Sequence, residues 1–491
     1  MKLELLPPEL IGRILDEAFQ LMLKPGIKVQ SEEARHLLAS AGADVDEAAQ
    51  VVRIPEKTVR AALETVPSEF FLYDRRGRPK VQYGGDAVHF DPGSSGVHIL
   101  DPETGEHRPS ETKDLARLVK VAEMLTQYDA QSTAVVCNEI PKEIGDLWRL
   151  YVVLMLSEKP IVTGSFSLKT LGAMIDMLAI YAPSTSLRAG GGRSALTSKP
   201  QAVFDVCPSP PLIWSAFGAG NLIELARAGV PAEIVSMPLA GAGSPVTLLG
   251  SIVQHAAECL SGITIHQLAK PGAPIVWGGA PAIFDMRKGS TPMGAIETAM
   301  IDAGYAQVGK SLGLPTHCYL CASEAKVVDA QSGLESGMTA LIGALAGVNM
   351  ISGAGMLDFL ACQSPEKLTI DAEAIGMIQH LLKGITVRTE TLATAMFEGI
   401  NFKADFLKQK VTRELFPKEQ YLPSSIIDRD SMRGWLESGS LDTFDRAKLR
   451  VNDLLAKYQR PESVLAQEKE LVEMVSSLAR GAGMDKLPEL M

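Results

Sequence analysis

The densest group of chemically capable side chains is the segment HCYLCASE, which runs from His317 to Glu324. It combines an imidazole, two thiols in CxxC spacing, a phenol and a carboxylate. His, Cys and Glu are all zinc ligands, so a zinc site of His317, Cys318, Cys321 and Glu324 is one interpretation. A single CxxC is weak evidence, however, and cysteines also fill small apolar positions of alternating strands. We therefore expect no metal in this chain, and we assign His317 and Glu324 to catalysis.

Aromatic residues make up only 5% of the chain, yet several lie close to predicted strand ends. Converging aromatic rings can hold a quaternary ammonium by cation–π attraction, and ordinary core packing is the alternative. Because His317 and Tyr319 belong to the same strand end, we expect the rings to surround them. The candidate substrate-contacting residues are Tyr319, Phe166, Trp277, Phe359 and His98, together with Ser352 and, by its charge, Arg193.

These residues would be positioned by a regular alternation of strand and helix patterns that begins near residue 111. Seven short apolar runs alternate with helical patterns, and an eighth strand is predicted at 367–370 with a helix from Ala372. Apolar strands alternating with helices predict a parallel sheet covered on both faces. Eight units favour a closed (β/α)8 TIM-type barrel, in which catalytic groups lie at the strand C-termini. The seven runs are STAVVC, PIVTGSF, AVFDVC, AEIVSM, APIVWG, THCYL and VNMISG.

This α/β fold class implies three regions. Residues 1–110 are predicted to be a helical and β-ribbon extension, 111–390 the barrel, and 391–491 helices that pack on the barrel or make a subunit contact. A doubly wound sheet is the alternative, but the stretch GGGRSA at 190–195 is not followed by a phosphate-binding helix. No HExxH, GxSxG or P-loop pattern is present, which removes support for the common protease, lipase and kinase classes.

Bulk properties exclude other partners. The net charge of −11 argues against nucleic acid, whose binding usually needs a basic face. The uncharged runs at 234–254 and 338–357 are expected to be buried α/β core rather than membrane spans. The N-terminus lacks an apolar signal region, and the six cysteines are expected to be reduced, so we expect a cytoplasmic protein.

Longer stretches of the chain resemble the trimethylamine methyltransferase family, in the subset that lacks pyrrolysine. The resemblance runs nearly end to end, and its most specific part is 323–359. The stretches that carry it are LMLKPGIKVQSEEARHLLASAGADVD, RIPEKTVRAALETVPSEFFLYDR, GVHILDPETGEHRPS, SEAKVVDAQSGLESGMTALIGALAGVNMISGAGMLDF and TRELFPKEQYLPSSIIDR.

The resemblance implies a (β/α)8 barrel and transfer of a methyl group from a methylated amine to the cobalt of a separate corrinoid protein. Trimethylamine enzymes of the family carry pyrrolysine, whereas this chain has only standard residues. The substrate implied is therefore a quaternary amine such as glycine betaine, carnitine or proline betaine. A neutral amine then leaves without a general acid. For a betaine, Arg193, Arg287, His317 and Lys326 are candidate carboxylate anchors.

The resulting expectation is a corrinoid-dependent methyltransferase that forms a homo-oligomer. Two alternatives remain at this point. One is a zinc-dependent methyltransferase for another donor, and the other is a non-catalytic protein that binds quaternary amines.

Overall fold

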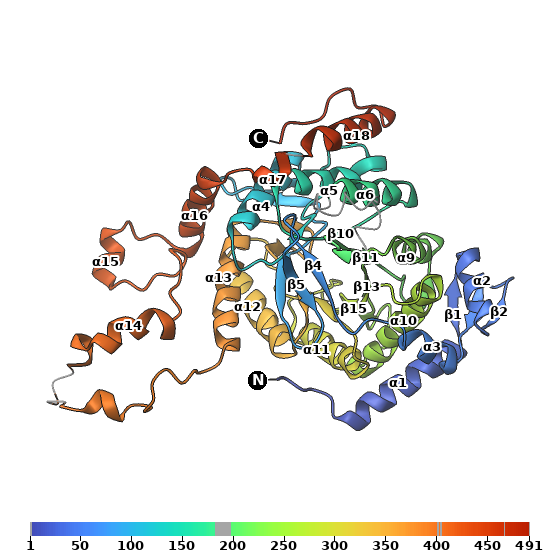
Figure 1. Ribbon diagram of the computed structural model, residues 1–491, viewed down its shortest axis with the longest axis horizontal. Helices are drawn as coiled ribbons and strands as arrows, with labels where there is room; N and C mark the ends of the chain where they lie inside the picture. The colour runs from blue at the N-terminus through green and yellow to red at the C-terminus, as the bar shows by residue number, and fades with distance from the viewer. Residues whose placement is uncertain (1, 182–197, 400–401, 403–404, 466, 491) are drawn as a thin grey trace.

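The computed structural model describes residues 2–181, 198–399, 402, 405–465 and 467–490 (Figure 1). Parallel strands form its centre. One parallel sheet has five strands in the order β15-β13-β11-β10-β9, and another has three in the order β17-β18-β6. These strands are β6 (His89–Pro92), β9 (Gln131–Ser132), β10 (Ile161–Gly164), β11 (Ala202–Val206), β13 (Ala232–Ser236), β15 (Ile275–Gly279), β17 (His317–Tyr319) and β18 (Met350–Ala354).

Helices between the strands cover the two sheets (Figure 1). Each predicted apolar run contains or overlaps one of the seven strands from β9 to β18, which confirms the alternating strand and helix pattern. The helices are α4 (Thr112–Met124), α5 (Gly145–Leu156), α6 (Leu168–Tyr181), α9 (Ala216–Ala228), α10 (Leu248–Ala269), α11 (Ile296–Ser311), α12 (Ala330–Leu345) and α13 (Pro365–Leu382).

The predicted eighth strand at 367–370 is wrong, because these residues lie in the first turns of α13. Ser364 caps this helix by accepting a hydrogen bond from the backbone N–H of Lys367, and Pro365 occupies its first turn, where proline is favoured. A strand from the N-terminal region, β6, pairs in parallel with β18 instead.

One helix among the described residues, α10, is long and apolar enough to cross a membrane. Its most apolar window is 83% buried inside the fold. Burial against neighbouring helices and strands accounts for its composition, as expected for the core helix of an α/β fold. The uncharged run at 338–357 is not one long helix, because it is divided between the end of α12 and the strand β18.

A hairpin closes one end of the central strands. It is formed by β4 (Phe70–Tyr73) and β5 (Pro79–Tyr83). Leu72, Val81 and Tyr83 of the hairpin pack into one apolar cluster with the side chains of the central strands. We call this cluster the apolar floor. Residues two apart on a strand point to the same side, so the polar residues described below lie next to it on the same inward face of the strands. Its members from the central strands and their approach are Ala130, Val162, Val203, Val276 and Met350.

The N-terminal region and the loops form smaller sheets. The strand order is β12-β1-β3-β2 in one four-stranded sheet and β19-β20-β7-β8 in another, while β14 pairs with β16. The elements are α1 (Pro8–Leu23), β1 (Ile27–Val29), α2 (Glu32–Ser40), β2 (Asp44–Asp46), β3 (Val51–Arg53), α3 (Glu56–Leu63), β7 (His98–Leu100), β8 (His107–Pro109), β12 (Ile213–Trp214), β14 (Leu239–Ala240), β16 (Ala282–Ile283), β19 (Met356–Leu357) and β20 (Cys362–Gln363).

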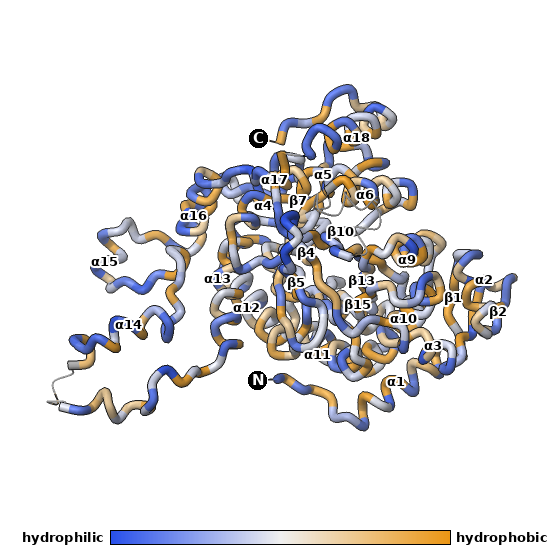
Figure 2. Tube along the Cα trace, in the orientation of Figure 1, coloured by the Kyte–Doolittle hydropathy of each residue, from blue (hydrophilic) through white to orange (hydrophobic). Residues whose placement is uncertain are grey.

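The chain after α13 leaves the body as an extended arm, drawn in orange at the left of Figure 1. Hydrophobic and hydrophilic segments alternate along it (Figure 2). Tyr421 and Ser424 bring the arm back to α13, where both donate hydrogen bonds to the carboxylate of Glu373. The C-terminal helices are α14 (Lys410–Glu419), α15 (Met432–Glu437), α16 (Thr443–Lys457), α17 (Glu462–Leu465) and α18 (Glu468–Gly481).

Candidate functional site

Above the apolar floor, two carboxyl groups lie side by side on neighbouring parallel strands. Asp205 of β11 and Glu233 of β13 are direct partners in the strand register. Glu233 is fully buried, whereas Asp205 keeps some contact with solvent. Oδ1 of Asp205 and Oε1 of Glu233 are both buried and accept no hydrogen bond from a described N–H or O–H group. Each carboxyl group nevertheless has a polar neighbour, because the two groups bond to each other and Oε1 of Glu233 lies close to the His317 ring.

His317 links Glu233 to a third acid. Its Nδ1 lies 3.2 Å from Oε1 of Glu233, and its Nε2 lies 3.0 Å from Oγ of Ser352. Ser352 in turn donates to Oδ1 of Asp91 on β6, at 2.6 Å. Glycine at position 278 makes room for the ring, since a Cβ there would lie 2.9 Å from Nδ1 of His317. The strands thus bring an imidazole and three carboxyl groups together.

Burial sets the protonation of this cluster. Loss of hydration is the largest cause that raises the pKa of Glu233 and of Asp91 well above the usual range of a carboxyl group. It raises the pKa of Asp205 to about 7, and hydrogen bonding to Glu233 and Tyr319 opposes the rise. It lowers the pKa of His317 to about 3, so the ring is neutral. Asp205 is therefore about half ionised near pH 7, and the cluster gains its negative charge there as the pH rises through about 7.

Two phenols complete the cluster from opposite sides. Tyr83, from the hairpin, donates to Oε2 of Glu233 at 3.0 Å. Tyr319 lies 3.5 Å from Oδ2 of Asp205 and 2.7 Å from Oγ of Ser94, in the loop after β6. Its ring meets that of His317 edge to face, with 5.2 Å between centroids. Because strand residues alternate, His317 and Tyr319 share one face of β17 while Cys318 faces the helices.

A buried cation approaches the same region from α5. Arg149 is 1% exposed and donates through Nη1 to Oγ of Ser95, at 3.0 Å, and to the carbonyl of Thr133. The ring of Phe166 lies 4.8 Å from its guanidinium carbon. Asp146 fixes Phe166 by accepting a hydrogen bond from its backbone N–H.

The structure brings some predicted site residues together and leaves others apart. His317, Tyr319 and Ser352 lie in the acidic cluster, and Phe166 lies beside Arg149. Glu324 is buried in a neighbouring loop, where its Oε1 accepts from the backbone N–H of Gly294 at 2.6 Å. Burial raises the pKa of Glu324. No hydrogen bond or ion pair among the described residues joins Glu324 to the cluster.

Trp277 lies outside the cluster. Its ring packs between β15 and the covering helices, where its Nε1 donates to the carbonyl of Tyr305 and its ring faces His255. Gly309 leaves room for the indole, since a Cβ there would lie 2.6 Å from the ring. Trp277 has the outward parity of β15, whereas Val276 and Gly278 have the inward one, so its ring faces the helices and a substrate contact for it stays a prediction.

The remaining candidates lie at the rim or beyond it. Phe359 carries the ammonium of Lys326 3.9 Å above its ring, and Lys326 also pairs with Asp358. His98 lies on β7, which pairs with β20 and β8 rather than with the central strands. Arg287 is exposed and paired with Asp285, so it is not free to anchor a substrate. Arg193 lies outside the described residues.

The two cysteines of the CxxC motif, Cys318 and Cys321, contact different neighbours. Cys318 contacts the helix layer near Gly343, whereas the backbone N–H of Cys321 bonds to Thr339 of α12. Burial raises the pKa of both thiols, which disfavours the thiolate form that binds zinc. Within the described ranges, no three His, Cys, Asp or Glu side chains are grouped to hold a metal ion.

Sequence reasoning missed Asp91, Asp205, Glu233 and Arg149. Strand ends and loops are where barrel sites are expected, whereas these three acids lie inside strands, in the stretches VHFDP, AVFDVC and AEIVSM. An isolated acid within an apolar strand was the available signal, because carboxylates are rarely buried without a role. Arg149 lies in the apolar helix sequence DLWRLYVVLML, where no pattern marks it as facing the strands.

The family-model match and a relative above 30% identity show the same family. The family model described as trimethylamine methyltransferase (MTTB) matches residues 1–482. The trimethylamine methyltransferase MttB of Methanosarcina thermophila is 32% identical over 465 residues, 94% of each chain. The glycine betaine methyltransferase of Desulfitobacterium hafniense strain Y51 is 29% identical over 462 residues, again 94% of each chain. The crystal structure of the Methanosarcina barkeri monomethylamine methyltransferase MtmB aligns at 13% identity and a TM-score of 0.49, covering 90% of this chain and 87% of that one.

Proposed function

The chain belongs to the trimethylamine methyltransferase family, and on that premise we propose that it transfers a methyl group from a quaternary amine of the glycine betaine type to the cobalt(I) of a separate corrinoid protein. The observation that carries this proposal is the buried group of Asp205, Glu233, His317 and Tyr319. It offers one carboxyl group that ionises near pH 7, and neutral rings around it, to a cation.

The chemistry needs little proton transfer. The cobalt(I) electron pair forms a bond to the methyl carbon, the carbon–nitrogen bond breaks, and its electron pair stays on nitrogen. The amine leaves neutral and cobalt becomes methylcobalt(III). The chain's own residues have to bind the cation, orient one methyl group outward and exclude water.

The protonation of the acidic cluster suits such a reaction. Positive charge on nitrogen disappears as the methyl group leaves, so three ionised carboxylates would stabilise the substrate more than the transition state. Since burial keeps Glu233 and Asp91 protonated, Asp205 alone supplies charge, and it is also the acid with solvent contact. We assign Asp205 and Tyr319 to the cation, and His317 with Ser352 to holding Glu233 and Asp91 in place. A role for Glu324, Phe359 or His98 stays a prediction.

The proposal includes a (β/α)8 barrel whose open end receives the corrinoid protein. A parallel bridge between Trp277 and Thr316 connects the five-stranded sheet to β17. On the other side, the backbone N–H of Asp129 bonds to the carbonyl of Phe90, and Gly96 bridges Val135 in parallel. These contacts support a closed ring of the eight strands. The division at residues 110 and 390 remains part of the proposal, although β6 joins the sheet from within the first segment.

We also propose a cytoplasmic location. Cobalt(I) survives only in a reducing compartment, and the six cysteines of the chain are all unpaired.

The test uses purified protein, its cobalt(I) corrinoid protein and a panel of methylated amines. We expect the absorption spectrum to change from cobalt(I) to methylcobalt(III) with a glycine betaine-type donor and not with trimethylamine. Conversion with trimethylamine alone would contradict the proposed substrate. No conversion with any donor, when a known methyl donor and its own enzyme methylate the same corrinoid protein, would contradict the proposed reaction.

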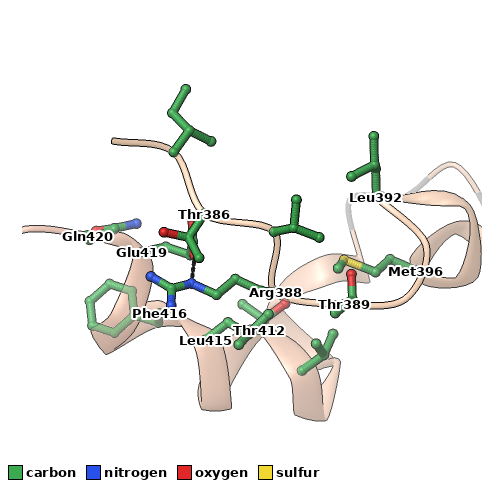
Figure 3. Close-up of a pocket in the computed structure, with 13 residues that line it drawn as sticks. Thr386, Arg388, Thr389, Leu392, Met396, Thr412, Leu415, Phe416, Glu419 and Gln420 are labelled. Carbon is green, nitrogen blue, oxygen red and sulfur yellow. Dashed lines mark hydrogen bonds and ion pairs between the residues drawn. The ribbon is translucent and has the colours of Figure 1, made fainter. Parts of the chain in front are cut away.

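A homo-oligomer is the last part of the proposal, and the arm supports it. Neither α14 nor α15 has a buried residue, and Ile385, Val387 and Phe402 are more than two-thirds exposed. Figure 3 shows the apolar groove of the arm, of about 460 Å³, with Arg388 paired to Glu419 at its edge. We propose that a second copy of the chain covers this groove. Large exposed apolar surfaces mark interaction sites, and another copy is available wherever the protein is made. Analytical ultracentrifugation should give a dimer or larger, and a monomer at micromolar concentration would contradict this.

A further inference from the structure

Arg149 is a cation that is buried in the interior of the fold. Its residue surface is 1% exposed, and its Nε is buried without a hydrogen-bond partner. It forms no ion pair with any carboxylate in the described part of the chain, and its nearest protein contacts are a hydroxyl, a carbonyl and the Phe166 ring. A buried guanidinium that lacks an anion is costly, and a bound anion would relieve that cost.

Nearby acids do not fill this place. Asp146, one of the carboxylates close enough to act on Arg149, already accepts hydrogen bonds from Phe166, Thr170 and Leu147. Asp205, the other, faces the cluster with Glu233 and Tyr319.

Adjacent residues of one loop connect the guanidinium to the acidic cluster. Ser95 accepts from Arg149, while its neighbour Ser94 lies 2.7 Å from the phenol of Tyr319, which in turn approaches Asp205. The carbonyl of Thr133 that accepts from Arg149 follows β9, and Asp205 lies two strands away on β11. Two inter-strand spacings are about 10 Å. Arg149 and Asp205 are close enough for the charge of the carboxylate to act on the guanidinium, so a positive and a negative group lie near each other at the central strands.

We propose that Arg149 binds an anionic group of the substrate, so that the site selects a compact zwitterion with its ammonium near Asp205 and its carboxylate at the guanidinium. This inference rests on the proposed function, which needs only the cation. The planar guanidinium suits a carboxylate, and Phe166 holds it in position by stacking. A carboxylate on the substrate gives Arg149 the counter-ion that the described residues do not supply.

Binding without any corrinoid tests the inference. Isothermal titration calorimetry would compare glycine betaine with its methyl ester, which keeps the quaternary ammonium but lacks the negative charge. We expect wild-type protein to bind the betaine about 10- to 100-fold more tightly than the ester. Arg149→Met should remove this preference while retaining ester binding, and Arg149→Lys should keep part of it. Arg287→Met, which removes an exposed guanidinium paired with Asp285, is the matched control and should leave the preference unchanged.

Two results would overturn the inference. One is a wild-type protein that binds ester and betaine equally, a result that needs no variant to fold. The other is an Arg149→Met protein that melts like wild type but still prefers the betaine. Methyl transfer from the ester to cobalt(I) tests the proposed function separately. Methyl transfer from the ester should continue in Arg149→Met. If wild-type protein transferred a methyl group from none of the donors, that result would count against the proposed function and not against this inference.

Discussion

Replacing Asp205 with asparagine is expected to weaken binding of a quaternary ammonium by at least a hundredfold and to make the empty protein more stable at pH 8. Asparagine keeps the shape of the side chain but removes the charge that the cluster gains as the pH rises through about 7. Leaving a buried cation without its partner charge typically costs about 3–5 kcal/mol, which corresponds to at least a hundredfold in affinity.

The pH dependence has a defined sign. A cation favours ionised Asp205, whose pKa in the folded protein is raised to about 7. Wild-type affinity should therefore rise about tenfold per pH unit below pH 7 and level off above it. The asparagine variant should show no such rise. Calorimetric titration at pH 6, 7 and 8 measures both, and a flat wild-type profile would contradict the assignment of Asp205.

Stability changes in the opposite direction. Because the folded-state pKa of Asp205 lies above its ordinary value of 3.8, the folded protein holds this proton more tightly than the unfolded chain. The free energy of unfolding then falls as pH rises from about 4 to 7, by at most about 4 kcal/mol for three pKa units. Asparagine at this position cannot ionise, so the variant should gain that stability at pH 8 and lose the advantage near pH 4. Asp285→Asn, at an exposed ion pair, is the control and should show no such gain. Thermal melts at the two pH values decide the outcome.

The same residue shows what the sequence could and could not predict. The run AVFDVC was recognised as a strand because its apolar residues and length are typical of one, and β11 confirms it. Asp205 was not predicted as a site residue, because catalytic residues were expected at the strand ends. Parity would have corrected this, since Asp205 and Val203 share the inward face on which the apolar floor is built. The same rule would have separated Trp277 from His317.

Other parts of the site depend on contacts that a single sequence does not contain. Tyr83 reaches Glu233 across 150 positions, and Ser352 reaches Asp91 across 261. The role of β6 as a strand beside β18 also follows from such a contact, because HFDP is too short to indicate its partner. Arg149 is recognisable only from its burial without an ion pair to a described carboxylate, which is a property of the folded interior.

The segment 367–370 gives the second large effect, on stability. Replacing Lys367 with methionine is expected to lower the free energy of unfolding by about 3–5 kcal/mol. Lys367 and Asp371 are 1% and 2% exposed, and the ammonium lies 2.6 Å from Oδ2 of Asp371 and 2.7 Å from Oγ of Ser336. Methionine fills a similar volume but leaves the carboxylate of Asp371 buried without a counter-ion.

The pair also explains why a strand was the wrong prediction there. Residues four apart are neighbours on a helix, whereas in a strand they are about 13 Å apart and cannot form this contact. The motif KLTID therefore contained a helix signal that its apolar residues concealed. A double-mutant cycle measures the contact directly, since a coupling free energy between positions 367 and 371 requires the helical geometry.

The second variant for that cycle is Asp371→Asn, which can still accept the hydrogen bond from the backbone N–H of Gly355. We expect Lys367→Met with Asp371→Asn to recover much of the stability lost in Lys367→Met alone. In the single variant, Asp371 should hold a proton more tightly when folded, so its deficit should be smaller at pH 5 than at pH 8. Lys410→Met makes the same substitution in the exposed pair with Glu414 and should cost no more than about 0.5 kcal/mol. Denaturant unfolding of wild type, the two single variants, the double variant and the Lys410→Met control measures these differences. If Lys367→Met cost as little as Lys410→Met, the buried pair would contribute almost nothing to the free energy of unfolding. The position of α13 would then be stabilised by its apolar face alone.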